Sequence, residues 1–271
     1  MKTEETIKNI RLYLFDMDGT LYIGDDLFEF TPPLLRTIRE RGADYLFMTN
    51  NSSKSVEDYI KKLSRLGIES VYDDFITSSQ VSAHYLKKEH PGAKVYICGT
   101  ESLKKEFEKS GFTVTANEDE AECILMGYDT ELTFAKLESV SRMLSLRDIP
   151  YYATNPDLVC PTEYGFVPDC GSVCGMIYNA TGKKPVVIGK PEPLMPLMAM
   201  EKKKAVPSET AVVGDRIYTD IKSGINAGAV TVLVMSGETD QKTLDASEDK
   251  PDIVLQSCAD ILRILKIDQW H

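Results

Sequence analysis

The stretch LYLFDMDGTLYIGD, residues 12–25, leads from an apolar run directly into Asp16 and Asp18 and then into Gly19. Two carboxylates at the end of a buried strand repel one another, so their presence needs an explanation. One explanation is a hairpin, because Asp-Gly between two apolar runs is a strong turn signal. The other is a cation site, and the choice depends on what the rest of the chain brings to the same place.

Short apolar runs alternate with amphipathic segments along the chain, which is the pattern of an α/β protein. Between the runs lie helical segments such as residues 55–67, with a capping-box-like start at Ser55 and Asp58 and a stop at Gly67. We therefore expect a doubly wound, parallel, Rossmann-like sheet. Its buried strands are predicted at residues 11–16, 44–49, 185–190, 210–215 and 229–235.

A second pattern begins near residue 81 and indicates an inserted α/β module. We expect a core formed by residues 1–80 and 185–271, with residues 81–184 as the insert. The insert is predicted to have strands at 94–99, 122–127 and 151–155, a helix at 133–147 and a Gly/Pro-rich loop at 161–172.

Composition limits the classes of partner. The chain has 271 residues, a formal net charge of -11 and 42% hydrophobic residues, which is typical of a globular protein. Its negative charge argues against nucleic acid or an anionic membrane as partner. The sequence shows neither an apolar signal segment nor a run long enough to span a membrane, so we expect a cytoplasmic protein with six free thiols.

Four of the predicted strands end on residues that carry useful chemistry: Asp16, Thr49, Lys190 and Asp215. Each has an ordinary explanation, as part of a turn, a loop, the surface or a helix cap. However, ligands of doubly wound sheets bind at the carboxyl ends of the strands. Four such residues at the same edge of one sheet predict a functional site.

Several other site types fail on their spacing. An EF-hand starting at Asp16 requires Gly at its sixth position and Glu at its twelfth, but the chain has Leu21 and Leu27 there. No stretch fits the nucleotide P-loop pattern. Proton transfer must fall to carboxylates, because none of the histidines stands at a predicted strand end: His84, His90 and His271.

The motifs DMDGT at 16–20, MTN at 48–50, GKP at 189–191 and GDRIYTD at 214–220 resemble, in order and spacing, the four motifs of the haloacid dehalogenase superfamily. The segments MTNNSS, YYATNPD, TGKKP and IGKPEPLM are further similar to the NagD-type, para-nitrophenylphosphatase-like branch, which has a large α/β cap between its second and third motifs. One departure is Asp169, where such proteins often have a second glycine.

The resemblance implies a phosphatase that forms an aspartyl-phosphate. Asp16 would be the nucleophile, and Asp18 would protonate the leaving alcohol and then activate water. Residues two apart on an extended strand face the same way, which suits this division of labour. Because an ionised Asp16 repels a phosphate dianion, a divalent cation is needed, and Mg²⁺ suits hard oxygen ligands. By resemblance its site comprises Asp16, the main-chain carbonyl of Asp18, Asp215 and, beside them, Asp220.

The same resemblance assigns the phosphoryl oxygens to Thr49 and to the amides of Asn50 and Asn51, with Gly19 in the substrate site. The helix that follows adds its N-terminal dipole. Lys190 supplies the local positive charge that an acidic chain needs in order to hold a phosphate.

The insert bears on the choice of substrate. A cap over the strand ends can close on a small phosphorylated metabolite, whereas it would obstruct a folded phosphoprotein. The segment Asn155-Pro156-Asp157 either contacts the leaving group or is a plain turn. Sugar phosphates and nucleoside monophosphates both remain open as substrates. The sequence is also compatible with a homodimer.

Two other functions use similar residues. A phosphate-accepting receiver domain also combines acidic residues, Thr and Lys around magnesium, but it normally has no inserted domain. A metal-dependent glycosyltransferase could use Asp16-Met17-Asp18 to hold a nucleotide sugar, but it would leave the motifs at Lys190 and Asp215 without a role.

Overall fold

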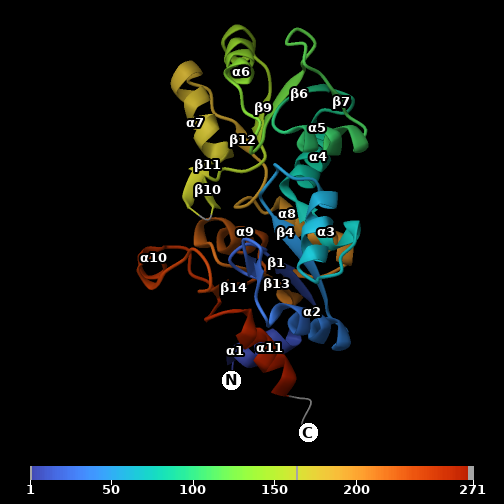
Figure 1. The fold of residues 1–271 in the computed structure, drawn as a ribbon, viewed down its shortest axis with the longest axis vertical. Coiled ribbons are helices and arrows are strands. Elements are labelled where there is room, and N and C mark those ends of the chain that lie inside the picture. Colours follow the sequence, from blue (N-terminus) through green and yellow to red (C-terminus); the bar gives the residue numbers. More distant parts are fainter. Residues whose placement is uncertain (1, 163, 268–271) are drawn as a thin grey trace. The chain divides into compact units, whose positions relative to one another are not determined.

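The computed structural model describes residues 2–162 and 164–267. The chain divides into two compact units (Figure 1). Unit 1 comprises Met1–Thr49, Ile60–Ile76 and Lys190–His271, and unit 2 comprises Asn50–Tyr59 and Thr77–Gly189. Each unit is built around its own sheet.

The sheet of unit 1 has six strands in the order β15-β14-β13-β1-β4-β5, and every pairing from β15 to β4 is parallel. Its central strands are buried along their whole length, as expected when helices cover both faces of a parallel sheet. The strands are β1 (Leu12–Phe15), β4 (Asp44–Thr49), β5 (Phe75–Thr77), β13 (Thr210–Gly214), β14 (Val230–Val234) and β15 (Ile253–Leu255).

The order of these strands reverses at β1. After β1 the chain continues to β4 and β5 on one side, and it later returns to β13, β14 and β15 on the other side. Phe15 pairs with both Val213 and Phe47, so β1, β13 and β4 end at nearly the same level. Such a reversal opens a crevice outside the carboxyl ends of the strands, where ligands bind.

Helices and short elements complete unit 1. Helix α11 packs on α1 and α2, while α8 packs against β1 and α9. The elements are α1 (Lys2–Asn9), β2 (Tyr22–Ile23), β3 (Asp26–Leu27), α2 (Thr31–Glu40), η1 (Tyr72–Asp74), α8 (Leu194–Lys203), η2 (Pro207–Glu209), η3 (Ile217–Ile221), α9 (Lys222–Ala227), α10 (Gln241–Ala246) and α11 (Cys258–Lys266).

Helix α3 (Val56–Arg65) begins with the predicted capping box. The Ser55 amide donates to Asp58 Oδ2 at 3.0 Å, and the Asp58 amide donates to Ser55 Oγ at 3.2 Å. Two backbone donors that have no partner in the first helical turn are thereby satisfied.

Unit 2 has a second parallel sheet, in the order β12-β9-β8-β6-β7. One apolar cluster fills the space between this sheet and helices α6 and α7. The elements are α4 (Ser78–Glu89), β6 (Lys94–Cys98), α5 (Glu101–Lys109), β7 (Thr113–Val114), β8 (Cys123–Met126), α6 (Phe134–Leu146), β9 (Tyr151–Ala153), β10 (Val159–Thr162), β11 (Gly165–Pro168), α7 (Cys170–Thr181) and β12 (Val186–Val187). An α/β fold with two parallel sheets confirms the predicted fold class.

Two elements differ from the prediction. The run 185–190 is not a core strand, because β12 pairs with β9 in the sheet of unit 2. An apolar run has the same composition in either sheet, so its sequence could not decide between them. The predicted loop 161–172 instead includes the end of β10, all of its antiparallel partner β11 and the first turn of α7.

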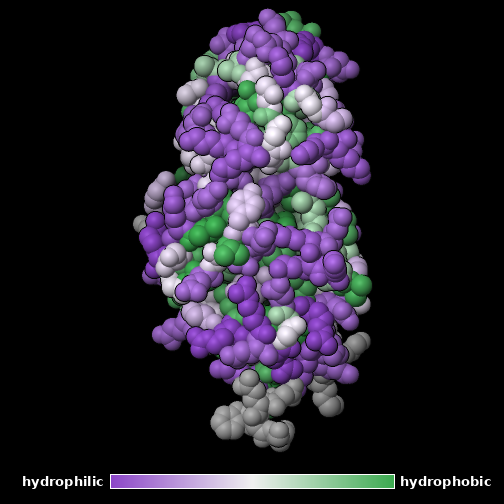
Figure 2. Space-filling model, turned by 90° about the vertical axis from the view of Figure 1, so that its right-hand side faces the viewer, coloured by the Kyte–Doolittle hydropathy of each residue, from purple (hydrophilic) through white to green (hydrophobic). Residues whose placement is uncertain are grey.

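The face in Figure 2 is mostly hydrophilic, with smaller hydrophobic areas between the polar side chains. The six cysteines are free. Among the helices of the described residues, none combines the length and apolar character that crossing a membrane requires.

Candidate active site

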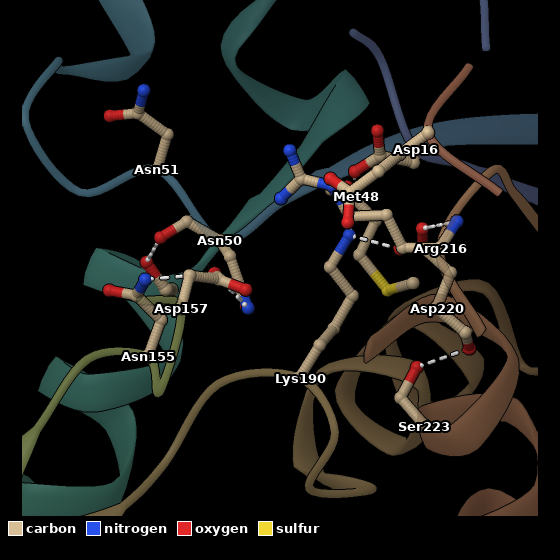
Figure 3. Close-up of polar contacts among 12 residues, drawn as sticks. Asp16, Met48, Asn50, Asn51, Asn155, Asp157, Lys190, Arg216, Asp220 and Ser223 are labelled. Atoms are coloured by element: carbon tan, nitrogen blue, oxygen red, sulfur yellow. Dashed lines mark hydrogen bonds and ion pairs between the residues drawn. The ribbon is translucent and has the colours of Figure 1, made fainter. Parts of the chain in front are cut away.

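Lys190 is the centre of a buried charge cluster in unit 1. Its Nζ donates to Asp16 Oδ1 and to Asp220 Oδ1, both at 2.6 Å, and to the carbonyl of Met48 at 3.2 Å. Only 2% of the Lys190 side chain is exposed. Figure 3 shows this side chain extended toward Met48, Asp16 and Asp220. All three donor positions of the ammonium group are therefore used, which fixes its place.

Asp16 follows directly on β1 and remains partly open. Its amide donates to Val213 in the neighbouring strand at 2.8 Å, which holds the backbone in line with the sheet. The Asp16 side chain is 16% exposed, whereas that of Asp220 is 1% exposed. Within this pair, Asp16 is the carboxylate that an external molecule can reach.

Asp215 follows on β13 and is enclosed by backbone. The Glu238 amide donates to its Oδ2 at 2.7 Å. A Cβ added at Gly19 would lie 2.6 Å from that Oδ2, and one added at Gly237 would lie 2.0 Å from it. Asp215 Oδ1 is buried and has no hydrogen-bond partner among the described residues. A buried carboxylate oxygen that accepts no hydrogen bond is suited to serve as a ligand of a cation.

The three carboxylates of this site lie close enough to share one cation. Ligand oxygens of Asp16, Asp215 and Asp220 are all within 4.8 Å of one another. Lys190 balances one of the three charges. The remaining two negative charges and the hard oxygen donors fit a divalent cation such as Mg²⁺.

Burial and the neighbouring charges shift the pKa values of the groups in this cluster. Burial raises the pKa of Asp215 to about 6, and the charge of Asp220 adds to the rise. Burial also raises the pKa of Asp16 well above its ordinary value, with Lys190 opposing the effect. Burial disfavours the Lys190 ammonium, but Asp16 and Asp220 together raise the pKa of Lys190, so it stays charged.

Asp18 does not lie on the strand, contrary to the geometry expected from the sequence. β1 ends at Phe15, and residues 17–22 form a turn in which the Leu21 amide donates to the carbonyl of Met17 at 2.8 Å. Gly19 has φ +83°, a conformation that side chains other than glycine rarely adopt. The turn places Asp18 at the exposed surface of unit 1. Its relation to Asp16 is therefore set by the turn and not by strand alternation.

Thr49 ends β4, beside β1, and is 8% exposed. The ends of β1, β4 and β13 thus bring Asp16, Thr49 and Asp215 to one edge of the sheet of unit 1. Lys190 joins them in a different way from the one predicted, because it follows β12 of the other sheet instead of a core strand.

The remaining predicted site residues belong to unit 2. The side-chain Nδ2 atoms of Asn50 and Asn155 both donate to Asp157 Oδ2, each at 2.9 Å. Asn51 Oδ1 accepts from the Ser53 amide at 2.9 Å, which closes a short turn after Asn50. Asn50, Asn155 and Asp157 are buried.

Sequence reasoning missed the loop after β14, which contributes Gly237 and the Glu238 amide to the surroundings of Asp215. It also missed the Arg216 amide, which donates to Asp220 Oδ2 at 3.1 Å. The first of these could have been found, because the predicted strand 229–235 ends at the same edge of the sheet.

Two family models match the chain. The model of haloacid dehalogenase-like hydrolases covers residues 13–113, and a second model of similar hydrolases covers residues 187–261. Both matched segments contain residues of the charge cluster.

Curated relatives match along most of the chain. A 5′-nucleotidase of Bacillus subtilis is 34% identical over 251 residues, which is 93% of this chain and 97% of the relative. An acid sugar phosphatase of Staphylococcus haemolyticus is 33% identical and covers 90% of this chain and 92% of its own. Among solved structures, a 4-nitrophenylphosphatase of Thermotoga maritima superposes with a TM-score of 0.91 at 36% identity, over 95% of this chain and 98% of its own.

Proposed function

This chain belongs to the haloacid dehalogenase-like hydrolases, in the branch of NagD and the p-nitrophenylphosphatases, and is a phosphatase; on that premise we propose that it hydrolyses small phosphate monoesters with Mg²⁺ through an aspartyl-phosphate at Asp16. The parallel sheet of unit 2 is its cap domain. The receiver and glycosyltransferase alternatives are set aside, because the relatives along nearly the whole chain are phosphatases.

The observation that carries the mechanism is the contact between Lys190 and Asp16. Lys190 Nζ holds Asp16 Oδ1 at 2.6 Å, so the carboxylate has a fixed orientation at the end of β1. Its partial exposure leaves it accessible to a phosphate ester. Asp16 attacks phosphorus, the bond to the leaving oxygen breaks, and the Lys190 ammonium offsets negative charge at the reacting group.

Asp18 handles the protons in this scheme. It lies in the turn two residues after the nucleophile and is exposed, so its carboxyl group can exchange protons with solvent. It gives a proton to the leaving alcohol and then takes one from the water that hydrolyses the aspartyl-phosphate. This second step returns Asp16 to its carboxylate form and releases inorganic phosphate.

The bound Mg²⁺ would supply charge neutralisation between the attacking carboxylate and the phosphoryl oxygens. We assign it to Asp16, Asp215 and the carbonyl of Asp18. Both oxygens of Asp220 accept hydrogen bonds, from Lys190 and from the Arg216 amide. We therefore assign Asp220 to holding Lys190, which makes it a positioning residue.

The phosphoryl oxygens are held in this proposal by Thr49 and by the backbone amides of Asn50 and Asn51, with the Gly19 turn beside them. The substrate class is a sugar phosphate or a nucleoside monophosphate. The names of two relatives, an acid sugar phosphatase and a 5′-nucleotidase, support this pair of classes.

The test is phosphate release from a panel of sugar phosphates, nucleoside monophosphates and 4-nitrophenyl phosphate with Mg²⁺. Asp16→Asn should reduce every rate by about a thousandfold or more, because the amide is a poor nucleophile. Asp240→Asn is the matched control, since Asp240 caps α10 and asparagine caps equally well. Full turnover by Asp16→Asn would remove the nucleophile assignment.

A further inference from the structure

Asn50 is held in unit 2 by its side chain and by its backbone. Its Nδ2 donates to Asp157 Oδ2 at 2.9 Å, and its carbonyl accepts from Ser78 Oγ at 2.6 Å. Asn50 is 7% exposed, and Ser78 is fully buried. Asn50 is also the residue that follows Thr49 in the chain, so whatever fixes its side chain also fixes the peptide next to Thr49.

Asp157 is itself held by a second buried amide. Asn155 Nδ2 donates to Asp157 Oδ2 at 2.9 Å and to Asp169 Oδ1 at 3.2 Å, while Asn155 Oδ1 accepts from Thr154 Oγ1 at 2.9 Å. The donors and the acceptor of the Asn155 carboxamide are thereby engaged within unit 2. Asn155 is 1% exposed and Asp157 is 3% exposed, so both lie inside the unit.

Asp169 connects this network to a helix. It is the N-cap of α7 and accepts from the Cys170 amide. Its position is therefore fixed by the helix, and its contact with Asn155 sets which way the Asn155 carboxamide faces.

Gly189 brings the residue before Lys190 to the same place. Its amide donates to the carbonyl of Thr154 at 2.9 Å. A Cβ added at Gly189 would lie 2.3 Å from that carbonyl and 2.7 Å from Asn50 Oδ1. The network therefore includes Asn50 and contacts Gly189, the residues of unit 2 that stand next to Thr49 and next to Lys190 in the chain.

We propose that Asp157, Asn155 and Asp169 are positioning residues that set the affinity for the substrate phosphate through Asn50. This replaces the role of leaving-group contacts for Asn155 and Asp157. The inference rests on the proposed function, in which the backbone amide of Asn50 binds a phosphoryl oxygen. Because the network acts on the phosphate half of the substrate, its effect is the same for every ester.

The experiment measures KM, kcat and the inhibition constant of inorganic phosphate for the parent and for Asp157→Ala. Alanine leaves two buried amides without an acceptor. We expect the phosphate inhibition constant and the KM of every ester to rise together by about tenfold, the effect of one lost hydrogen bond. Asp157→Asn keeps a carbonyl oxygen that accepts both amides, so it should restore values close to the parent.

A second pair of variants keeps the test decisive if Asp157→Ala does not fold. Asp169→Gly removes the contact to Asn155 and should raise the same constants by a smaller factor, whereas Asp169→Asn retains an acceptor and should not. Glu106→Gln changes a buried acid on α5 of the same unit that lies 3.7 Å from Lys109, and it controls for lost stability without touching Asn50.

Three outcomes overturn the inference: an unchanged phosphate inhibition constant, a changed ranking of esters, or an equal effect of Glu106→Gln. Each would leave the proposed function intact, provided that the parent turns over the esters and is inhibited by phosphate. A parent without turnover would instead contradict the proposed function.

Discussion

Lys190 Nζ donates to Asp220 Oδ1 at 2.6 Å, and Asp220 is fully buried. The Gly214 backbone stands against the Asp220 carboxylate, since a Cβ there would lie 2.3 Å from its Cγ. The end of β13 therefore fixes the position of the Asp220 carboxylate, and this carboxylate in turn holds the Lys190 ammonium group through its hydrogen bond. Asp215 occupies a different environment, with one buried oxygen that has no hydrogen-bond partner among the described residues.

These environments predict different effects for Asp220→Asn and Asp215→Asn. Asp220→Asn weakens the hold on Lys190, so kcat should fall by about tenfold or more while the magnesium concentration for half-maximal rate stays near that of the parent. Asp215→Asn should raise that magnesium concentration strongly, because it removes a proposed ligand. Titration of the rate with Mg²⁺ separates the two. A shifted magnesium dependence in Asp220→Asn would identify Asp220 as a direct ligand.

The stability of the metal-free protein should depend on pH through Asp215. Its pKa is raised from 3.8 to about 6 in the folded state. The unfolded state releases this proton first, so the carboxyl group costs nothing below pH 4 and destabilises the fold increasingly as the pH rises through 6. The loss is ~3 kcal/mol in total, at ~1.4 kcal/mol for each pKa unit.

Asp215→Asn cannot ionise, and its side-chain oxygen still accepts from the Glu238 amide. Without metal, the Tm of the variant should therefore be higher than that of the parent at pH 8. At pH 4 the two Tm values should be equal. Thermal unfolding in the presence of a chelator measures this difference. A difference in Tm that is the same at both pH values would mean that the Asp215 charge does not contribute.

Metal removal should stop turnover. A chelator leaves the negative charges of Asp16, Asp215 and Asp220 without a bound cation, so a phosphate ester is repelled. We expect the rate to return with added Mg²⁺, and the Tm at pH 8 to rise because the cation binds only the folded state. The rate of 4-nitrophenyl phosphate hydrolysis after exhaustive chelation provides the measurement, and undiminished turnover there would reject a cation-dependent reaction.

Much of the sheet of unit 1 could be predicted, because buried parallel strands leave a strong signal. The runs before Asp16, Thr49 and Asp215 are mostly apolar, and each forms a strand that ends within one residue of the expected position. The strands β5 and β15 were not predicted, since each has only three residues and resembles any short apolar segment.

The sheet to which the strand before Lys190 belongs could not be predicted from the local sequence. Two residues of β12 pair with β9, and this pairing depends on the whole insert being folded. The hydrogen bonds of Asn155 and Asp157 were hidden for a similar reason. Asn50 and Asp157 are 107 positions apart, so only the folded unit 2 shows that they meet.

The turn at residues 17–22, which follows β1, leads to a further prediction. Gly19 combines φ +83° with a backbone that lies against Asp215, where an added Cβ would stand 2.6 Å from Oδ2. Gly19→Ala meets both obstacles, so it should destabilise the protein by ~1–3 kcal/mol and also displace Asp215. Gly24→Ala is the matched control, because Gly24 has φ +58° but nothing within 4 Å of its added Cβ.

The two variants separate backbone strain from the contact with Asp215. Gly24→Ala should lose stability through its backbone alone and keep the magnesium dependence of the parent, whereas Gly19→Ala should need more Mg²⁺ for half-maximal rate. Denaturant unfolding and a magnesium titration of the rate measure the two effects. If Gly19→Ala loses stability but keeps the parent's magnesium dependence, the turn supports the fold without shaping the cation site.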